Sequence, residues 1–291
     1  MRKILSTRYD GLIAHYYFKN PGLGVTQLSD LIQEFEAPMV SKETFDRMVK
    51  RWMLSQKEDL TPEQVELETW KAQSGNTLVI GDLHAPFILE GYLDFCQNLS
   101  EKYNCDQVIF IGDVIDGAGW NFHERDPDGM GVGHELDAAI AQLTPWYEAF
   151  PTAKIMLGNH DLLIARKAKA IGMSQRFVKP LGEILQAPTT WEFMEEYQEN
   201  GVLYTHGNVG NAFKRAKDSR LSTVQGHLHS EASVNWSVSV KDRLFGMQVG
   251  CGIDHEAYAF SYGKPFPRKP VISAGLVLEN GSLPFVELME L

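Results

Sequence analysis

Five short, β-rich apolar runs, each followed at once by glycine and by metal-binding residue types, constrain the fold of this chain most strongly. The runs cover residues 77–80, 107–111, 154–157, 202–205 and 223–225, and helical stretches around 90–103 and 134–149 separate the earlier ones. This alternation predicts an α/β layered fold. Further runs at 234–240, 244–249, 271–278 and 285–289 have no helical pattern between them and predict antiparallel strands.

The polar residues after the first five runs occupy equivalent positions. Loops of an α/β sheet converge at the carboxyl ends of its strands, so these residues are expected to meet there. Glycine beside each candidate permits unusual turns and a close approach of the backbone. An extended D-x-H or H-x-H segment would place both of its side chains on one side. The blocks are Gly81-Asp82-Leu83-His84, Gly112-Asp113-Val114-Ile115-Asp116, Gly158-Asn159-His160-Asp161, His206-Gly207 and Gly226-His227-Leu228-His229.

Each block alone is weak evidence, because an Asp after a strand is commonly a helix cap and a lone His is commonly a surface or core residue. Five such blocks together predict a metal site. Imidazole, carboxylate and amide oxygen without thiolate favour Mn²⁺, with Fe, Zn²⁺ or Ni²⁺ as alternatives. The candidates suit two divalent ions that share a bridging carboxylate better than one tetrahedral ion. The seven candidates are Asp82, His84, Asp113, Asn159, His206, His227 and His229.

The composition indicates which partners and which cellular compartment are compatible with such a site. The net charge of −11 argues against broad nonspecific binding of nucleic acid, although a local basic groove remains compatible with it. The three cysteines form no C-x-x-C pair, which argues against a disulfide framework. We find no apolar run near the roughly 20 residues that a bilayer requires and no signal peptide, so we expect a cytoplasmic protein without a membrane contact.

Residues 1–73 predict a small helical extension ahead of a main domain at 74–291. Two stripes at helical spacing support it, and a Thr-Pro-Glu start predicts a third helix at about 62–73. Two short helices joined by a turn fit either a cap on the main domain or a helix-turn-helix that contacts phosphates. The stripes are Leu28, Leu31, Ile32, Phe35 and Phe45, Met48, Val49, Trp52.

The order D-x-H, G-D-x-x-D, G-N-H-D, H-G, G-H-x-H over residues 76–230 resembles the calcineurin-like metallophosphoesterase superfamily. The resemblance implies two β-sheets sandwiched between helices, and hydrolysis of a phosphate ester by a metal-activated hydroxide. It further implies that Asp113 bridges two metals. Asp82, His84 and His229 would hold the first metal, and Asn159, His206 and His227 the second.

The resemblance also implies roles for residues that hold no metal. His160 would act beside the phosphate as a general acid or charge stabiliser, and Asp116 would orient it. Protein serine/threonine phosphatases usually continue G-D-x-x-D with Arg-Gly, whereas Gly117-Ala118 follows here. Purple acid phosphatases usually carry Tyr where Asp116 stands. The pattern is therefore closer to the phosphodiesterase and repair-nuclease branch.

Two segments are candidates for substrate contact. The Gly-rich stretch 117–131 carries Trp120, Phe122, His123 and Arg125, which could stack on a base and bind a phosphate. The alternative is a solvated connection whose aromatic residues pack locally. The stretch 210–217 adds three cations near His206, which could bind phosphate or form one exposed helix face.

Three functions fit these residues. The first is hydrolysis of a phosphodiester, in a nucleic acid or a nucleotide. The second is hydrolysis of a phosphomonoester, in a small molecule or a phosphoprotein, with the same metals. The third is a metal-dependent binding scaffold with reduced catalysis, which has no need for an acid such as His160. The motifs do not separate the first two, and they do not define an oligomeric state.

Overall fold

The computed structural model describes residues 10–20, 24–36, 42–55, 75–122, 128–208, 210–261 and 268–290. The chain divides into two units, Met1–Gln73 and Ser74–Leu291, and each is described by itself. The first unit contains α1 (Asp10–Lys19), α2 (Val25–Glu36) and α3 (Lys42–Ser55). The two predicted amphipathic helices are thus present as α2 and α3, while the helix predicted at 62–73 lies outside the described residues.

Most residues of the predicted stripes form the core of the first unit, whereas Leu31 is half-buried and lies outside this cluster. Leu28 and Ile32 of α2 pack with Phe45 and Val49 of α3 in one buried cluster, because side chains four residues apart share a helix face. Ile13 of α1 joins the same cluster. The three helices therefore share a small core of their own.

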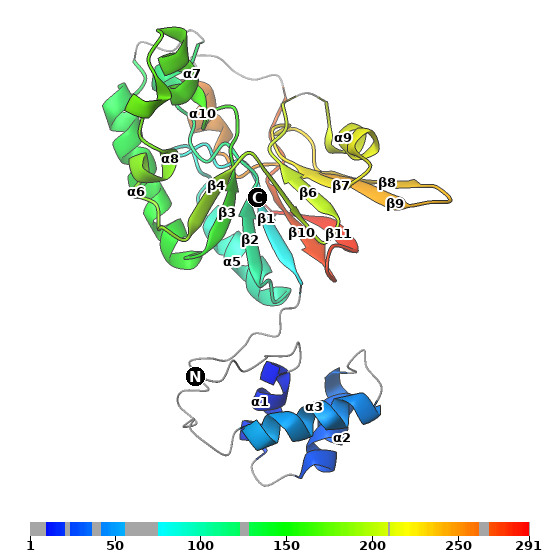
Figure 1. Cartoon of the computed structure of the whole chain (residues 1–291). Helices are drawn as coiled ribbons and strands as arrows, with labels where there is room; N and C mark the ends of the chain where they lie inside the picture. The colour runs from blue at the N-terminus through cyan, green and yellow to red at the C-terminus, as the bar shows by residue number, and fades with distance from the viewer. Residues whose placement is uncertain are drawn as a thin grey trace. The chain divides into compact units, whose positions relative to one another are not determined.

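The second unit is built on two β-sheets (Figure 1). The six-stranded sheet has the order β11-β10-β1-β2-β3-β4, and the five-stranded sheet has the order β5-β6-β7-β9-β8. The first sheet comprises β1 (Thr77–Ile80), β2 (Gln107–Phe110), β3 (Ala153–Met156), β4 (Trp191–Met194), β10 (Ser273–Leu278) and β11 (Leu283–Leu288). The second comprises β5 (Glu196–Glu199), β6 (Val202–Thr205), β7 (Ser222–Gln225), β8 (Ser233–Val238) and β9 (Arg243–Gln248).

Alternation along the central strands explains the layers. Leu78 and Ile80 belong to a core cluster shared with α5 (Tyr92–Lys102) and α6 (Val132–Ala149), while Val79 between them faces a second cluster. Successive strand residues point to opposite faces, so a strand buried on both sides is apolar throughout. The second cluster contains residues of both sheets and lies between them. The two sheets are therefore sandwiched between helices, as predicted.

The C-terminal part differs from the sequence prediction in two respects. β8 pairs with β9, and β10 with β11, in the predicted antiparallel sense. However, a helix that was not predicted, α10 (His255–Ser261), lies between β9 and β10, and β9 pairs in parallel with β7. The sequence also missed the short strands β4 and β5. Within the described part of the chain, no helix is long and apolar enough to cross a membrane.

Candidate metal centre

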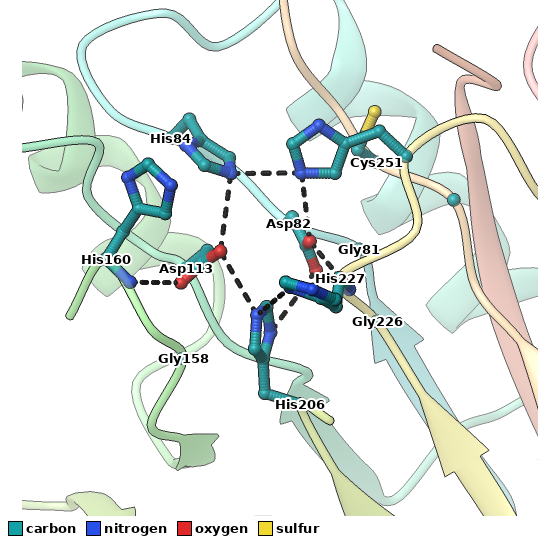
Figure 2. Close-up of polar contacts among 12 residues, drawn as sticks. Gly81, Asp82, His84, Asp113, Gly158, His160, His206, Gly226, His227 and Cys251 are labelled. Atoms are coloured by element: carbon teal, nitrogen blue, oxygen red, sulfur yellow. Dashed lines mark hydrogen bonds and ion pairs between the residues drawn. The ribbon is translucent and has the colours of Figure 1, made fainter. Parts of the chain in front are cut away.

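The five polar blocks converge at one place in the second unit (Figure 2). They follow β1, β2, β3, β6 and β7, whose carboxyl ends carry the loops of the site. Asp82, His84, Asp113, Asp116 and His206 are all at most 2% exposed. Burial of so many ionisable groups is costly unless opposite charge compensates them, so the cluster needs cations or protons.

The first group of converging residues consists of Asp82, His84, Asp113 and His229, and the lone pairs of these side chains point at one another. His84 Nδ1 lies 2.8 Å from Asp116 Oδ1, so this nitrogen carries the proton and donates to the carboxylate. His84 Nε2 therefore keeps a lone pair, and it faces His229 Nε2 at 3.1 Å and Asp113 Oδ2 at 3.6 Å. Asp82 Oδ2 lies 3.1 Å from His229 Nε2. A cation among these atoms would satisfy all of them.

A second convergence lies on the other side of Asp113. His206 Nδ1 donates to the backbone oxygen of Ile111 at 3.1 Å, which leaves a lone pair on Nε2. That nitrogen faces Asp113 Oδ2 at 3.1 Å, Asn159 Oδ1 at 3.2 Å and His227 Nδ1 at 3.2 Å. The same oxygen, Asp113 Oδ2, thus faces one histidine of each group.

An unpaired oxygen also indicates a cation. Asp82 Oδ1 is buried and has no hydrogen-bond partner among the described residues, with His206 Nδ1 3.8 Å away, while Asp82 Oδ2 accepts from the backbone N–H of His227 at 2.9 Å. A buried carboxylate oxygen without a partner is unfavourable unless an ion binds it. Nitrogen and oxygen donors without thiolate are the ligands of Mn²⁺, Fe and Zn²⁺ sites. The residues present therefore fit divalent cations.

The electrostatics of the cluster favour positive charge. Burial alone would lower the pKa of His206, but the carboxylates of Asp113 and Asp82 raise it to about 10. Burial would raise the pKa of Asp113, but His206 and His160 hold it well below its usual range. The raised pKa of His206 shows the negative potential of the carboxylates, which attracts cations, and the lowered pKa of Asp113 shows that a nearby positive charge keeps this carboxylate ionised.

Three of the converging residues have backbone angles that most side chains avoid. The φ angles are 49° at His84, 47° at Asp113 and 70° at His227, all in the left-handed region. Such conformations cost roughly 1–3 kcal/mol each and cluster at functional sites. The D-x-H and H-x-H segments are therefore not extended, contrary to the sequence interpretation. A turn at His84 and at His227 brings the pairs together instead.

Two glycines leave the space that the carboxylates occupy. A Cβ at Gly226 would lie 2.4 Å from Asp82 Oδ1, and one at Gly158 would lie 2.1 Å from Asp113 Oδ1. No real side chain makes contacts this short, so any larger residue would displace a candidate ligand.

We expect Gly158→Ala to lower both metal content and stability, because the new methyl group must push Asp113 aside. Overpacking of this kind costs roughly 1–3 kcal/mol. Elemental analysis and the melting temperature measure the two effects. Gly133→Ala is the matched control, because an added Cβ there meets nothing within 4 Å. Unchanged metal content in Gly158→Ala would contradict the role of Asp113.

His160 and Asp116 lie beside the cluster but are arranged differently from the sequence expectation. His160 Nδ1 lies 2.5 Å from the backbone oxygen of Asp116 and 3.4 Å from its Oδ1. The shorter contact of the Asp116 carboxylate is with His84. The Asp116 carboxylate therefore contacts a candidate ligand as well as His160. Burial would lower the pKa of His160, but Asp113 and Asp116 raise it.

Sequence reasoning missed two neighbours of the centre. Asp161 is buried, and its carboxylate accepts from the backbone N–H groups of Gly158 and Val114 at 2.8 and 3.0 Å, which joins two of the loops. Its place in the G-N-H-D block was the available signal. Tyr258 of α10 lies with its ring 5.2 Å from the ring of His84. No local pattern marks this tyrosine.

The structure does not bring the predicted substrate residues together as it does the candidate metal ligands. Trp120 lies half-buried in the short helix η1 (Ala118–Trp120), packed against the main core cluster. His123 and Arg125 lie outside the described residues. A substrate role for these three residues stays a prediction.

The second unit thus has two mixed sheets between helices, with an Asp/His cluster at the strand ends that could hold metal ions. Residues 75–244 match the family model described as calcineurin-like phosphoesterase. The chain belongs to this family and is a phosphoric ester hydrolase by membership. No curated protein matches the sequence significantly.

Solved structures with similar folds include several phosphoesterases. An archaeal phosphodiesterase is 14% identical with a TM-score of 0.40, over 74% of this chain and 99% of its own. The phosphoesterase Yfce from E. coli is 15% identical with a TM-score of 0.34, over 69% and 87%. The Pseudomonas putida nuclease MPE is 12% identical with a TM-score of 0.37, over 75% and 90%.

Proposed function

We propose that this chain hydrolyses phosphodiester bonds of a nucleic acid or a nucleotide with two divalent cations. The observation that carries the proposal is the position of Asp113 Oδ2. This oxygen faces the lone pair of His84 Nε2 in one cluster of candidate ligands and that of His206 Nε2 in the other. Mn²⁺ fits the donor set best, with Fe, Zn²⁺ or Ni²⁺ as alternatives. Asp82, His84 and His229 would hold one ion, Asn159, His206 and His227 the other, and Asp113 both.

In this proposal the cations and the side chains of the chain have different catalytic roles. When bound, the cations supply Lewis-acid stabilisation of phosphate charge and lower the pKa of water. His160 is held by its Nδ1 on the backbone oxygen of Asp116, so its Nε2 is the nitrogen that can give a proton. A positioned imidazole can protonate an alkoxide leaving group as its bond to phosphorus breaks.

The surroundings support a diester over a monoester. A diester has two organic groups, and a pocket of about 360 Å³ beside His227 and His229 offers space for one of them. The side chain of His160 is 18% exposed, so the centre is also open to solvent beside this residue, where the second organic group could lie. The phosphatase alternative is supported by Arg268 and Lys269 on the pocket wall, which could balance the extra charge of a monoester.

Parallel assays with Mn²⁺ on bis-p-nitrophenyl phosphate, p-nitrophenyl phosphate and single-stranded DNA test the proposal. We expect kcat/KM to be higher for the diester than for the monoester. A clear preference for the monoester would establish the phosphatase alternative. A protein with two bound ions and no activity on any of the three would be a binding scaffold.

We expect His160→Ala to keep both metals and to slow turnover by roughly the 10²–10⁴-fold that loss of a general acid produces. The loss should be larger for an alkoxide leaving group than for nitrophenolate, since only the alkoxide needs a proton. Metal content and rates with both leaving groups are the measurements. His134→Ala, an exposed histidine on α6, is the control. Equal slowing of both substrates would rule out the acid role.

We propose that the first unit is a helical extension of a catalytic domain at 74–291. Its separate core supports an independent element. Both roles considered for it, a cap and a nucleic-acid contact, are compatible with the structure of its three helices.

A further inference from the structure

Residues 162–182, directly after the loop of Asn159 and His160, carry a concentrated positive charge. This segment has five cationic residues and no acidic one, in a chain of net charge −11. Four of the five are exposed and one is half-buried. Within the described part of the chain, none of them forms an ion pair with a carboxylate. We call these five residues and Phe122 the α7 surface; the five are Arg166, Lys167, Lys169, Arg176 and Lys179.

The α7 surface starts at the metal centre. Helix α7 (Leu163–Ala170) begins three residues after His160, and the backbone N–H of Leu163 donates to the oxygen of His160 at 3.0 Å. An α-helix rises about 1.5 Å per residue, so its cations lie within roughly 10 Å along the helix from its start. The helix η2 (Gln175–Phe177) packs against α7 and extends the surface with Arg176.

Exposed aromatic rings accompany the cations. Phe122 is 53% exposed, and its ring centroid lies 4.2 Å from Lys167 Nζ and 5.3 Å from Arg166 Cζ. Phe177 in η2 is 81% exposed. Rings that bases can stack on, beside cations that follow a phosphate backbone, are the elements with which proteins bind single-stranded nucleic acid.

Two of the three cations of α9 (Ala212–Ser219), a candidate phosphate-binding segment from the sequence, are arranged differently. Lys214 pairs with Asp218, and Arg215 pairs with Glu196. Lys217 lies over the ring of Phe213, at 4.4 Å from its centroid. Binding of a phosphate at Lys214 or Arg215 would compete with an existing ion pair, whereas the cations of the α7 surface have no ion pair with any described carboxylate.

We propose that the α7 surface binds single-stranded nucleic acid and guides it to the metal centre. This inference rests on the proposed function, since it names the class of diester that the site receives. Charge complementarity selects a polyanion. The exposed rings select single strands, because only unpaired bases are free to stack on side chains.

The experiment compares two triple variants with equal charge change. Arg166→Gln, Lys167→Gln and Lys169→Gln are combined on α7, and Lys214→Gln, Arg215→Gln and Lys217→Gln on α9. Fluorescence anisotropy of the Mn²⁺-loaded full chain measures binding of labelled twelve-nucleotide oligodeoxythymidine and oligouridine at several salt concentrations. Hydrolysis of bis-p-nitrophenyl phosphate is measured in parallel.

We expect the α7 variant to bind both oligonucleotides at least tenfold more weakly. The slope of log affinity against log salt should fall by about 0.7 for each phosphate contact removed. Phe122→Ala should weaken binding roughly 5- to 100-fold through lost stacking. The α9 variant should bind normally, and hydrolysis of the small diester should stay within twofold in both triple variants.

Other outcomes overturn the inference while leaving the proposed function intact. They are unchanged affinity in the α7 variant, a larger loss in the α9 variant, or binding of vesicles of anionic lipid through the α7 cations with no binding of oligonucleotide. Exposed Ile171, at 75%, makes the vesicle control necessary. If the wild type hydrolyses no diester at all, the proposed function itself fails, whatever the affinity for oligonucleotides.

Discussion

Asp113→Asn should reduce phosphodiester hydrolysis by several orders of magnitude and weaken the binding of both metal ions. Asp113 Oδ2 faces both His84 Nε2 and His206 Nε2, at 3.6 and 3.1 Å. The amide keeps the shape but removes the negative charge that would hold both cations. The loss should exceed the roughly 10- to 100-fold typical of changing a hydrogen-bond partner of a ligand.

Metal content by elemental analysis and kcat/KM on bis-p-nitrophenyl phosphate measure this prediction. Asp137→Asn makes the same chemical change at an exposed position of α6 and should leave both quantities unchanged. Asp116→Asn provides a graded comparison. It should weaken metal binding as well as turnover, because its carboxylate accepts from His84 Nδ1. Two bound ions per chain and near-normal turnover in Asp113→Asn would show that another residue bridges the metals.

Removal of metal should abolish activity and lower the melting temperature, with Mn²⁺ restoring both best among common divalent ions. In the proposed mechanism, activity depends on a Lewis acid that the Asp/His cluster would hold. The stability depends on the cations, because a ligand that binds only the folded state stabilises it by about 2.7 kcal/mol at a hundredfold excess over Kd. For a domain of this size that corresponds to a shift of roughly 5–10 °C.

Exhaustive dialysis against EDTA, elemental analysis and calorimetry before and after addition of each metal measure this effect. The Asp113→Asn variant is the control for stability, since its melting temperature should respond far less to Mn²⁺. Full hydrolysis in protein shown to be metal-free would refute the two-metal proposal. Better recovery with Zn²⁺ or Ni²⁺ would change the identity of the metal and keep the centre.

The local pattern of the chain predicted much of the fold. The apolar runs at 77–80 and 202–205 coincide with β1 and β6, because strands buried on both faces are marked by short continuous apolar sequences. The helix α10 and the strands β4 and β5 were missed. These elements are short, and tertiary packing rather than a periodic pattern holds them.

The site, like the fold, was predicted in part by local sequence pattern and decided in part by tertiary packing. The sequence by itself determined the family and the set of residues near the strand ends, because each block carries its chemistry in consecutive residues beside a recognisable strand. It also contained the run of unopposed cations after His160. The directions of the lone pairs depended on contacts such as that between His84 and His229, which are 145 residues apart.

Only the tertiary structure decided that Asp113 Oδ2 faces both histidine groups and that Asp116 orients His84. It also decided that Lys214 and Arg215 are paired with carboxylates, while the cations of α7 have no such pair within the described residues. The reason is physical. A linear pattern specifies residue type and local period, whereas partners and bond directions depend on which distant segments pack together and on the left-handed turns at His84, Asp113 and His227.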